Sequence, residues 1–451
     1  MKTRMTTGTL LLLTVLNTIT LTAPAQNSPF KHESVRLDLS FGFAGLVNSD
    51  FGFGRNDQAL ALDIQPDGKI VAAGVASIPG NGDDFAVIRY NNDDGSPDAT
   101  FGTNGTVTTN FFGGNDRATG VLIRPDGKII AGGDAFNTNT GNTDLALAAY
   151  NADGSLDSSF GINGKVTTDF GLNDLGNALI LQPDGKLILA GSVLDSKLSK
   201  DFALVRYNPD GSLDSGFGVG GKVITDFFKS SDEVSSIVLR SDGSILAAGF
   251  ADGGSSGRDF AVARYDSHGI LDTTFGVGGK ATVDFFGGVD EAKSIAFQPD
   301  GRIVLAGSAF NGTTLADFAL ARFNADGILD TSFGDQGKVT TDFARNLDEA
   351  RKLIALSDGS IIAAGRTFGN GSGSDFALVS YSSEGKLDRS FGSQGKLTTD
   401  FRAGNDQAFG MAVDSEGRVI LAGGAQISSQ DFALARYLLQ HAARLDANDK
   451  P

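Results

Sequence analysis

Aspartate is the residue type whose spacing most suggests chemistry in this chain. One Asp opens a short apolar segment seven times, and another opens a later segment seven times. The first series is Asp57, Asp116, Asp174, Asp232, Asp290, Asp348 and Asp406, and the second is Asp84, Asp144, Asp201, Asp259, Asp317, Asp375 and Asp431. Paired carboxylates on one face could chelate cations, but Asp at a strand start also accepts hydrogen bonds from loop amides. Both interpretations stay open.

A further Asp recurs in the motif L-D-x-S-F-G, as at Asp157 and Asp330. It stands beside a hydroxyl residue and Gly, where its carboxylate can bind turn amides as an Asx-turn. The nearby N-x-D-G resembles part of a calcium loop, but such a loop needs earlier carboxylates and a late bidentate Glu. The motif therefore favours a hairpin turn, with calcium binding as the alternative.

The usual catalytic groups are scarce in this sequence. His32, His268 and His441 are its three histidines, and it has no Cys. A His-based triad, a multi-His metal site and a Cys nucleophile are therefore not expected, and we assign no catalytic residues. Asp and Glu alone suffice for a glycosidase. A carboxylate-dependent, glycosidase-like hydrolase with its site in a central pocket is accordingly the alternative function.

The positions of these carboxylates follow a repeated unit. Phe-Gly recurs at intervals of 57 to 60 residues, a P-D-G-like turn follows it, and a D-F-A-L-like segment follows the turn. The Phe-Gly pairs begin at Phe41, Phe101, Phe160, Phe217, Phe275, Phe333 and Phe391. Seven copies at one period indicate a repeat architecture, in which each copy packs on its neighbours.

Each unit reads as four short strands. Residues 286–343 contain DEAKSIAFQ, RIVLAG, DFALARFN and GKVTTDF, separated by Q-P-D-G, N-A-D-G and other turn sequences. Pro presets φ in such a turn, Asp bonds to the backbone, and Gly accepts positive φ. Four antiparallel strands repeated seven times predict an all-β fold, a seven-bladed β-propeller. A β-solenoid is the competing architecture.

The same motifs resemble a known family. L-D-x-S-F-G, G-K-V-T-T-D-F, Q-P-D-G-K-I and D-F-A-L-A-R-Y-N are similar to the delta-60 repeat of bacterial exported proteins, over residues 37–437. The resemblance implies a β-propeller and export, and it supplies no catalytic residues. The strand order also resembles the NHL-type repeat, in which the strand before P-D-G is innermost. Residues 37–51 would then form the outermost strand of the blade at 406–437, so the N-terminal strand closes the ring.

Recurrent aromatic and basic residues are expected to build the blades. Phe41, Phe51, Phe85 and their repeats should pack blade on blade. Arginines on the third strand should pair with the L-D-x-S-F-G aspartates between blades, with Ala149 and Ser380 interrupting the series. These arginines are Arg89, Arg206, Arg264, Arg322 and Arg436.

The first 25 residues predict a secretory signal peptide. Lys2 and Arg4 precede an apolar stretch, and Ala23-Pro24-Ala25 offers an A-x-A cleavage site. Residues 26–36 would be a leader and 438–451 a C-terminal tail, and the protein would be secreted, extracellular or periplasmic. The formal charge is -17, and loss of Lys2 and Arg4 leaves 35 basic and 54 acidic residues, or -19. This charge disfavours nucleic acid as a partner, and no membrane insertion is expected.

The segment between A-G and D-F-A-L differs in every copy, unlike the turns. On a rigid scaffold such loops are where binding residues concentrate, although drift of tolerant loops would give the same pattern. We expect Phe136, Phe310 and Phe368 as apolar contacts and Asp290, Asp317, Asp348 and Asp375 as polar contacts. The predicted function is a non-enzymatic binding or scaffolding propeller for an extracellular protein or polysaccharide surface. No cofactor is expected beyond a cation on the acidic rim, and the oligomeric state stays open.

Overall fold

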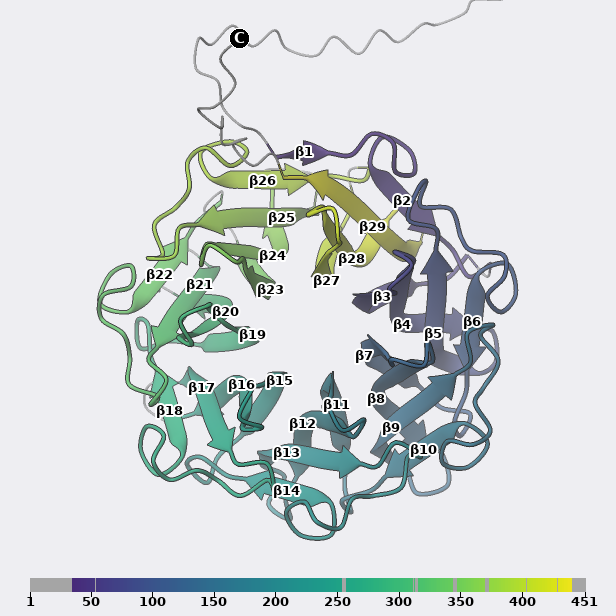
Figure 1. Cartoon of the computed structure of the whole chain (residues 1–451), viewed down its shortest axis with the longest axis horizontal. Helices are drawn as coiled ribbons and strands as arrows, with labels where there is room; N and C mark the ends of the chain where they lie inside the picture. The colour runs from purple at the N-terminus through teal and green to yellow at the C-terminus, as the bar shows by residue number, and fades with distance from the viewer. Residues whose placement is uncertain are drawn as a thin grey trace, which may run out of the picture. The chain divides into compact units, whose positions relative to one another are not determined.

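The computed structural model describes residues 35–439 apart from 53, 254–256, 311, 313–314, 344–346, 370–372, 403 and 428. The described residues form a ring of seven antiparallel sheets around a central axis (Figure 1). The predicted seven-bladed propeller is therefore confirmed, and the solenoid is not formed. The predicted signal peptide (1–25), the leader up to residue 34 and the tail beyond residue 439 lie outside the described residues. Within the described ranges, no helix is long and apolar enough to cross a membrane.

Each blade is a sheet of strands that step outward from the axis. The innermost strands are β3 (Asp57–Ile64), β7 (Asp116–Ile123), β11 (Asp174–Leu181), β15 (Asp232–Leu239), β19 (Asp290–Phe297), β23 (Asp348–Ala355) and β27 (Gln407–Val413). The second strands are β4 (Ile70–Ile78), β8 (Ile129–Asn137), β12 (Leu187–Leu194), β16 (Ile245–Asp252), β20 (Ile303–Phe310), β24 (Ile361–Phe368) and β28 (Val419–Gln426). The third strands are β5 (Gly82–Tyr90), β9 (Asn142–Tyr150), β13 (Lys200–Tyr207), β17 (Arg258–Tyr265), β21 (Ala316–Phe323), β25 (Ser374–Tyr381) and β29 (Gln430–Leu438). The outermost strands of the first six blades are β6 (Thr106–Thr109), β10 (Lys165–Thr168), β14 (Lys222–Thr225), β18 (Lys280–Val283), β22 (Lys338–Thr341) and β26 (Lys396–Thr399).

Strands from both ends of the sequence complete the seventh blade. β1 (Arg36–Leu37) and β2 (Leu46–Ser49) both pair with β29, in registers Leu37↔Tyr437 and Leu46↔Ala435. Figure 1 shows these purple N-terminal strands beside the yellow C-terminal ones. The predicted closure of the ring by the N-terminal strand is confirmed. Pairing of this kind leaves β29 with no open edge along these residues.

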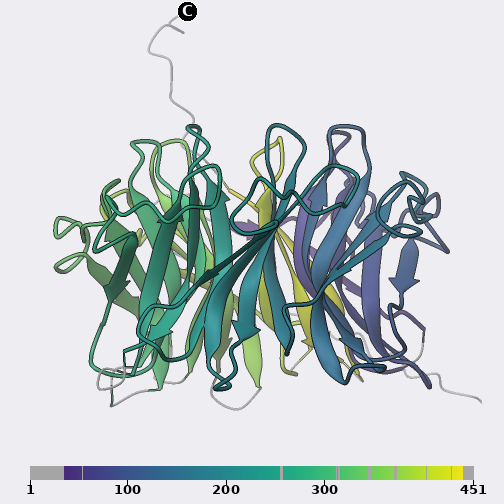
Figure 2. The same cartoon turned by 90° about the horizontal axis from the view of Figure 1, so that it is seen from below.

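The strands run between two rims of different character (Figure 2). In the fifth blade Asp290 pairs with Ala309, and Ala309 pairs with Asp317, so both Asp series and the loop between the second and third strands share one rim. We call this the variable-loop rim. The P-D-G and N-x-D-G turns lie at the other rim, which we call the turn rim. At Gly301, φ is +84° and its N–H donates to the Gln298 carbonyl (2.9 Å), as the P-D-G chemistry predicts.

The hydrophobic core lies between neighbouring blades. One cluster combines Phe260 and Phe275 of the fourth blade with Ile303 and Phe323 of the fifth, all fully buried or nearly so. Within a blade, the Phe of the third strand packs on the Phe that follows the outermost strand, as in Phe318 and Phe343, whose ring centroids are 5.0 Å apart. The predicted structural role of the repeated Phe residues is confirmed.

The third-strand arginines clamp each blade to the next. Arg322, completely buried, pairs through Nε with Oδ2 of Asp330 (2.8 Å), lies over the Phe333 ring (4.6 Å), and donates to the Ser383 carbonyl in the following blade. The predicted pairing with the L-D-x-S-F-G aspartate is confirmed, but the ion pair lies within one blade. The contacts of Arg322 that cross the junction are those with the Ser383 carbonyl and with the Glu384 carboxylate (3.0 Å). Ser332 donates to the same aspartate through N and Oγ, as an Asx-turn requires.

The two interruptions of the arginine series are resolved differently. Where Ala149 replaces Arg, Lys128 pairs with Asp157 (2.7 Å) and Arg124 donates to the next turn at the Pro209 carbonyl (2.8 Å). Where Ser380 replaces Arg, a cavity of about 400 Å³ remains beside Asp388 and Phe391. In the seventh blade, the chain passes from β29 into the C-terminal tail instead of the N-x-D-G turn that would accept such an arginine.

A tyrosine hydroxyl makes a second contact across most junctions. Tyr150 and Thr109 are joined at 2.8 Å, and equivalent bonds join Tyr207 to Thr168, Tyr265 to Thr225, Tyr381 to Thr341 and Tyr437 to Thr399. Between the fourth and fifth blades both partners are apolar, because Phe323 replaces Tyr and Val283 replaces Thr. The polar pair and the apolar pair each leave the junction free of an unsatisfied hydroxyl.

Two phenylalanines of one short loop, Phe41 and Phe43, allow the closure of the ring by the N-terminal strands to be tested by substitution. Phe41 is fully buried under the Arg436 guanidinium (4.2 Å from ring centroid to Cζ), whereas Phe43 is 83% exposed. Replacing Phe41 by Ala should lower the free energy of unfolding by about 3–5 kcal/mol, since it empties a core site at the closing junction. Phe43→Ala is the matched control and should change it by less than about 0.5 kcal/mol. Equal denaturation midpoints for both variants would contradict closure through this loop.

Candidate functional site

The Asp that opens each innermost strand fastens the turn that leads into its blade. In all seven blades its Oδ2 accepts the N–H of the Phe that follows the preceding outermost strand, at 2.6–2.9 Å. These aspartates are at most 1% exposed. Asp290 and Asp348 therefore accept hydrogen bonds from the backbone N–H groups of Phe285 and Phe343. Of the two roles that the sequence left open, cation binding and acceptance of loop amides, the second is the one observed.

Carboxylates nevertheless gather beside these buried aspartates on the variable-loop rim. In the third-to-fourth junction Asp201, Asp226 and Asp232 each offer an oxygen within 4.8 Å of the others. The same grouping recurs as Asp50, Asp57 and Asp431; Asp144, Asp169 and Asp174; Asp259, Asp284 and Asp290; and Asp317, Asp342 and Asp348. At the first-to-second junction Asn110 takes the third place and donates to Asp84 Oδ1 (3.0 Å). The cation expected on this rim stays a prediction.

Burial raises the pKa of the strand-opening aspartates. It reaches about 7 for Asp116, Asp174 and Asp232 and about 6 for their four counterparts, and the neighbouring carboxylates add to the rise. The pKa values of Asp84, Asp144 and Asp375 on the same rim are also raised by burial. Near neutral pH this rim therefore holds several carboxyls close to their midpoint of ionisation.

The three predicted apolar contacts occupy one structural position in three blades. Phe136, Phe310 and Phe368 each follow the residue that pairs with the strand-opening Asp, at the variable-loop end of the second strand. Phe310 is 39% exposed, and Phe136 and Phe368 are half-buried. The Arg366 guanidinium stacks on the Phe368 ring at 5.2 Å. Of the predicted polar contacts, Asp317 is buried like Asp290 and Asp348, and Asp375 is half-buried.

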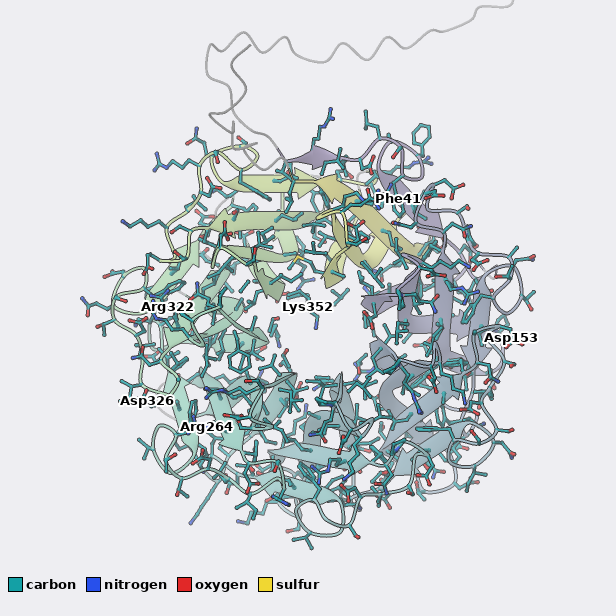
Figure 3. The ribbon with its side chains drawn as sticks, in the orientation of Figure 1. Phe41, Asp153, Arg264, Arg322, Asp326 and Lys352 are labelled. Atoms are coloured by element: carbon teal, nitrogen blue, oxygen red, sulfur yellow. The ribbon has the colours of Figure 1, made fainter. Side chains whose placement is uncertain are left out.

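A second candidate site lies on the axis of the ring. Every innermost strand carries a β-bulge, whose extra residue comes three positions after the Asp of the first series, and these extra residues line one cavity of about 200 Å³. These seven residues are Leu60, Thr119, Asn177, Ser235, Lys293, Arg351 and Phe409. Arg117, Glu233 and Lys352 complete the lining, and Lys352 lies at the inner edge of the ring in Figure 3.

The charged groups around this cavity are unlike the repeated carboxylates. Lys293 pairs with Glu291 (2.7 Å) and Arg351 with Glu349 (2.7 Å), and Glu349 also accepts from Arg366 (2.9 Å). Although burial opposes ionisation, these cations hold the pKa of Glu291 and Glu349 below the ordinary value. Both oxygens of Asp134, whose pKa is raised by burial, accept from Arg117 (3.3 and 2.8 Å).

A second, adjoining cavity links this channel to the variable-loop rim. It has a volume of about 250 Å³ and shares Glu233 and Lys293 with the axial cavity. Its wall includes Leu198 of a variable loop, which is 72% exposed, and Phe250, on which Arg258 stacks at 4.4 Å. A ligand on this side of the rim would thus lie beside the entrance to the channel.

The sequence interpretation overlooked this axial site, although two signals pointed to it. The third position after the Asp that starts each innermost segment is the one where the seven copies carry seven different residues. The Gly of each A-G pair is the second signal: a Cβ added to Gly307 would lie 1.9 Å from the Glu291 carbonyl oxygen. That Gly is needed because the bulged strand approaches its neighbour closely.

Stability should fall as pH rises from about 5 to 7.5. The strand-opening aspartates have folded-state pKa values above their unfolded value of 3.8, so their contribution is complete below about pH 4 and is lost as they ionise through pH 6–7. Asp174→Asn should remove one such dependence, on the order of 1 kcal/mol after solvent screening, and raise the melting temperature at pH 7.5 only. Asp184→Asn, in an exposed turn, is the control. Wild-type stability that rises over this range would contradict the assignment.

Several solved structures are similar to this chain at low sequence identity. They include an acylaminoacyl peptidase in complex with Z-Gly-Gly-Phe-chloromethyl ketone (13% identity, 85% of this chain, 52% of that chain, TM-score 0.44). A second is a polysaccharide lyase of family PL25, an ulvan lyase (11% identity, 87% of this chain, 96% of that chain, TM-score 0.48). A third is Drosophila Semaphorin 2a (9% identity, 90% of this chain, 77% of that chain, TM-score 0.49). The chain spans about half the length of the peptidase. These likenesses concern the fold alone.

Sequence comparison identifies the repeat itself. No curated protein matches the chain. Six stretches match the family described as "Domain of unknown function (DUF5122) beta-propeller": residues 65–101, 124–160, 182–217, 240–275, 298–333 and 356–391. Each stretch begins at a turn of the turn rim and ends at the Phe-Gly pair of the same blade. Six of the seven blades of this chain therefore contain a stretch that matches the repeat of the DUF5122 β-propeller family.

Proposed function

We propose that this chain is an exported, non-enzymatic binding propeller that holds an extracellular protein or polysaccharide surface on its variable-loop rim. The observation that carries the proposal is the contrast between the two rims. One rim repeats nearly the same P-D-G turn seven times, whereas the other presents seven different loops on equivalent strands. Binding residues concentrate on loops held by a rigid scaffold.

The rim offers apolar and ionisable groups side by side. Phe310 is 39% exposed, and the Arg366 side chain covers the Phe368 ring. An aromatic side chain buries a large area with few rotatable bonds, and a neighbouring carboxylate or guanidinium adds directional contacts. A flat partner surface with mixed polarity suits this arrangement.

Export is supported by the predicted signal peptide and by the resemblance to the delta-60 repeats of bacterial exported proteins. The ion pairs of Glu291 and Glu349 argue against these two carboxyls as the acid and base of a hydrolase, and so favour a binding role. A glycosidase needs one carboxyl protonated and one ionised. Here the cations around Glu291 and Glu349 hold both in the ionised form, because each carboxylate accepts from two basic side chains.

The rim assignment is tested with a glycan and matrix-protein array probed with residues 26–451. The triple variant Phe136→Ser, Phe310→Ser and Phe368→Ser should lose about tenfold or more in affinity for whichever array component the wild type binds, since hot-spot aromatics dominate binding energy. The matched control is Phe43→Ser, Ile162→Ser and Val219→Ser, at exposed apolar positions of the turn rim. Loss of binding in the control alone would place the site on the turn rim.

A further inference from the structure

The axial cavity is a positively charged region in an acidic protein. Around it lie seven basic side chains, Arg117, Lys200, Arg258, Lys293, Arg351, Lys352 and Arg366. Four acidic groups pair with six of them: Asp134, Glu233, Glu291 and Glu349. The excess of three positive charges contrasts with the formal charge of -17 for the whole chain. A low-dielectric channel of one sign concentrates ligands of the opposite sign.

Two of these basic groups have unused capacity toward the cavity. Nε of Arg351 is buried and has no hydrogen-bond partner in the described part of the chain, although Nη2 is bound to Glu349. Across residues 35–439, as far as they are described, no ion pair is formed by Lys352. Burial alone lowers its pKa, with no carboxylate opposing the shift. An unpaired, partly buried cation and an unsatisfied buried donor both cost stability, so their side-by-side retention points to an anionic ligand.

The rest of the cavity wall is divided into two further sectors. Phe409 and Leu60, from the seventh and first blades, form an apolar sector, and Arg351 stacks on the Phe409 ring at 4.5 Å. Thr119, Asn177 and Ser235, from the second to fourth blades, form a neutral polar sector. Thr119 donates to the Gly176 carbonyl (2.7 Å) and Asn177 donates to the Val234 carbonyl (2.8 Å). The side-chain oxygens of both residues can therefore still accept hydrogen bonds from a ligand.

We propose that this axial cavity binds the carboxylate-bearing residue of an acidic sugar, a uronate. The carboxylate lies between Arg351 and Lys352, where guanidinium N–H and ammonium groups form charge-assisted hydrogen bonds. The sugar hydroxyls donate to Thr119, Asn177 and Ser235. The C–H face of the ring packs on Phe409, since aromatic side chains offer a flat apolar surface to such a face.

This site goes beyond the rim proposal, because it does not need the rim phenylalanines. A chain end that carries a uronate could reach it from the variable-loop rim through the cavity lined by Leu198 and Phe250. Loss of the rim phenylalanines would then leave uronate binding intact, and loss of Lys352 would leave binding of a neutral rim ligand intact. The two proposals therefore fail separately.

The experiment is isothermal titration of residues 26–451 with D-glucuronate, D-galacturonate and their short oligomers, compared with D-glucose, D-galactose, sulfate and a short peptide with a free C-terminus. At least one uronate should bind, and Arg351→Gln and Lys352→Met should each weaken that binding tenfold or more. Lys386→Met removes an exposed lysine of the turn rim, outside both cavities, and should leave affinity unchanged.

Melting temperatures separate loss of binding from loss of fold. Lys352→Met should melt at the wild-type temperature or above, because it removes a partly buried charge that forms no ion pair in the described residues. The proposal is overturned if no uronate binds the wild type, if the neutral sugars bind equally well, or if Lys386→Met weakens binding as much as Lys352→Met. Equal or tighter binding of sulfate or of the peptide would also overturn it, as it would mark a site for simple anions or for peptide carboxylates.

Discussion

A blade of this propeller can bury its two faces only against its neighbours, and every other feature depends on that constraint. The core clusters each draw on two adjacent blades, and the arginine clamp carries a charge from one blade to a carbonyl of the next. A four-stranded sheet with both faces exposed would be marginal in water. Stability therefore depends on seven junctions, including the one that joins the N-terminal strands to β29.

Residues that face each other across a junction between two blades differ together from those at the other junctions. Phe323 stands opposite Val283 where other junctions place a Tyr hydroxyl on a Thr hydroxyl. Likewise, Arg124 donates to the Pro209 carbonyl of the next blade, the kind of contact that the arginine missing at position 149 would make. In both cases the paired residues come from different repeats, so comparing whole repeats position by position hides the compensation. Contacts across the junction explain it, because a buried hydroxyl or carboxylate without its partner is costly.

Most of the fold followed from local chemistry that the sequence displays. Turn residues such as Pro299, Asp300 and Gly301 mark strand ends, and their sevenfold recurrence fixes the number of blades. Closure by residues 37–51 followed from strand order. The role of Asp290 could not be settled in the same way, because the Phe285 N–H that it binds is brought near only by the folded junction. The signal peptide and the function of the rim residues Phe136, Phe310 and Phe368 stay predictions.

The axial site was missed because a bulge is a property of paired backbones. The segment DEAKS does not indicate which of its residues has no cross-strand partner. In the folded sheet Ala292 pairs with Gly307 and Ser294 pairs with Ala306, so Lys293 is the unpaired residue. The divergence of this position among the copies was visible, but it was indistinguishable from tolerant surface drift. The folded ring turns seven scattered substitutions into one cavity wall.

The bulged residues also break the approximate sevenfold symmetry of the ring at the axial cavity. Seven similar blades around one axis would offer a central ligand seven equivalent orientations, and none would be preferred. Because the bulged residue has no cross-strand partner, it can be replaced without disturbing the ladder on either side. Leu60, Ser235 and Arg351 thus give different directions around the axis different chemistry on a backbone that is nearly the same in all of them. The charged, apolar and neutral polar sectors of the wall then favour one orientation of a bound molecule. A scaffold built of similar blades can in this way hold an asymmetric ligand in one orientation.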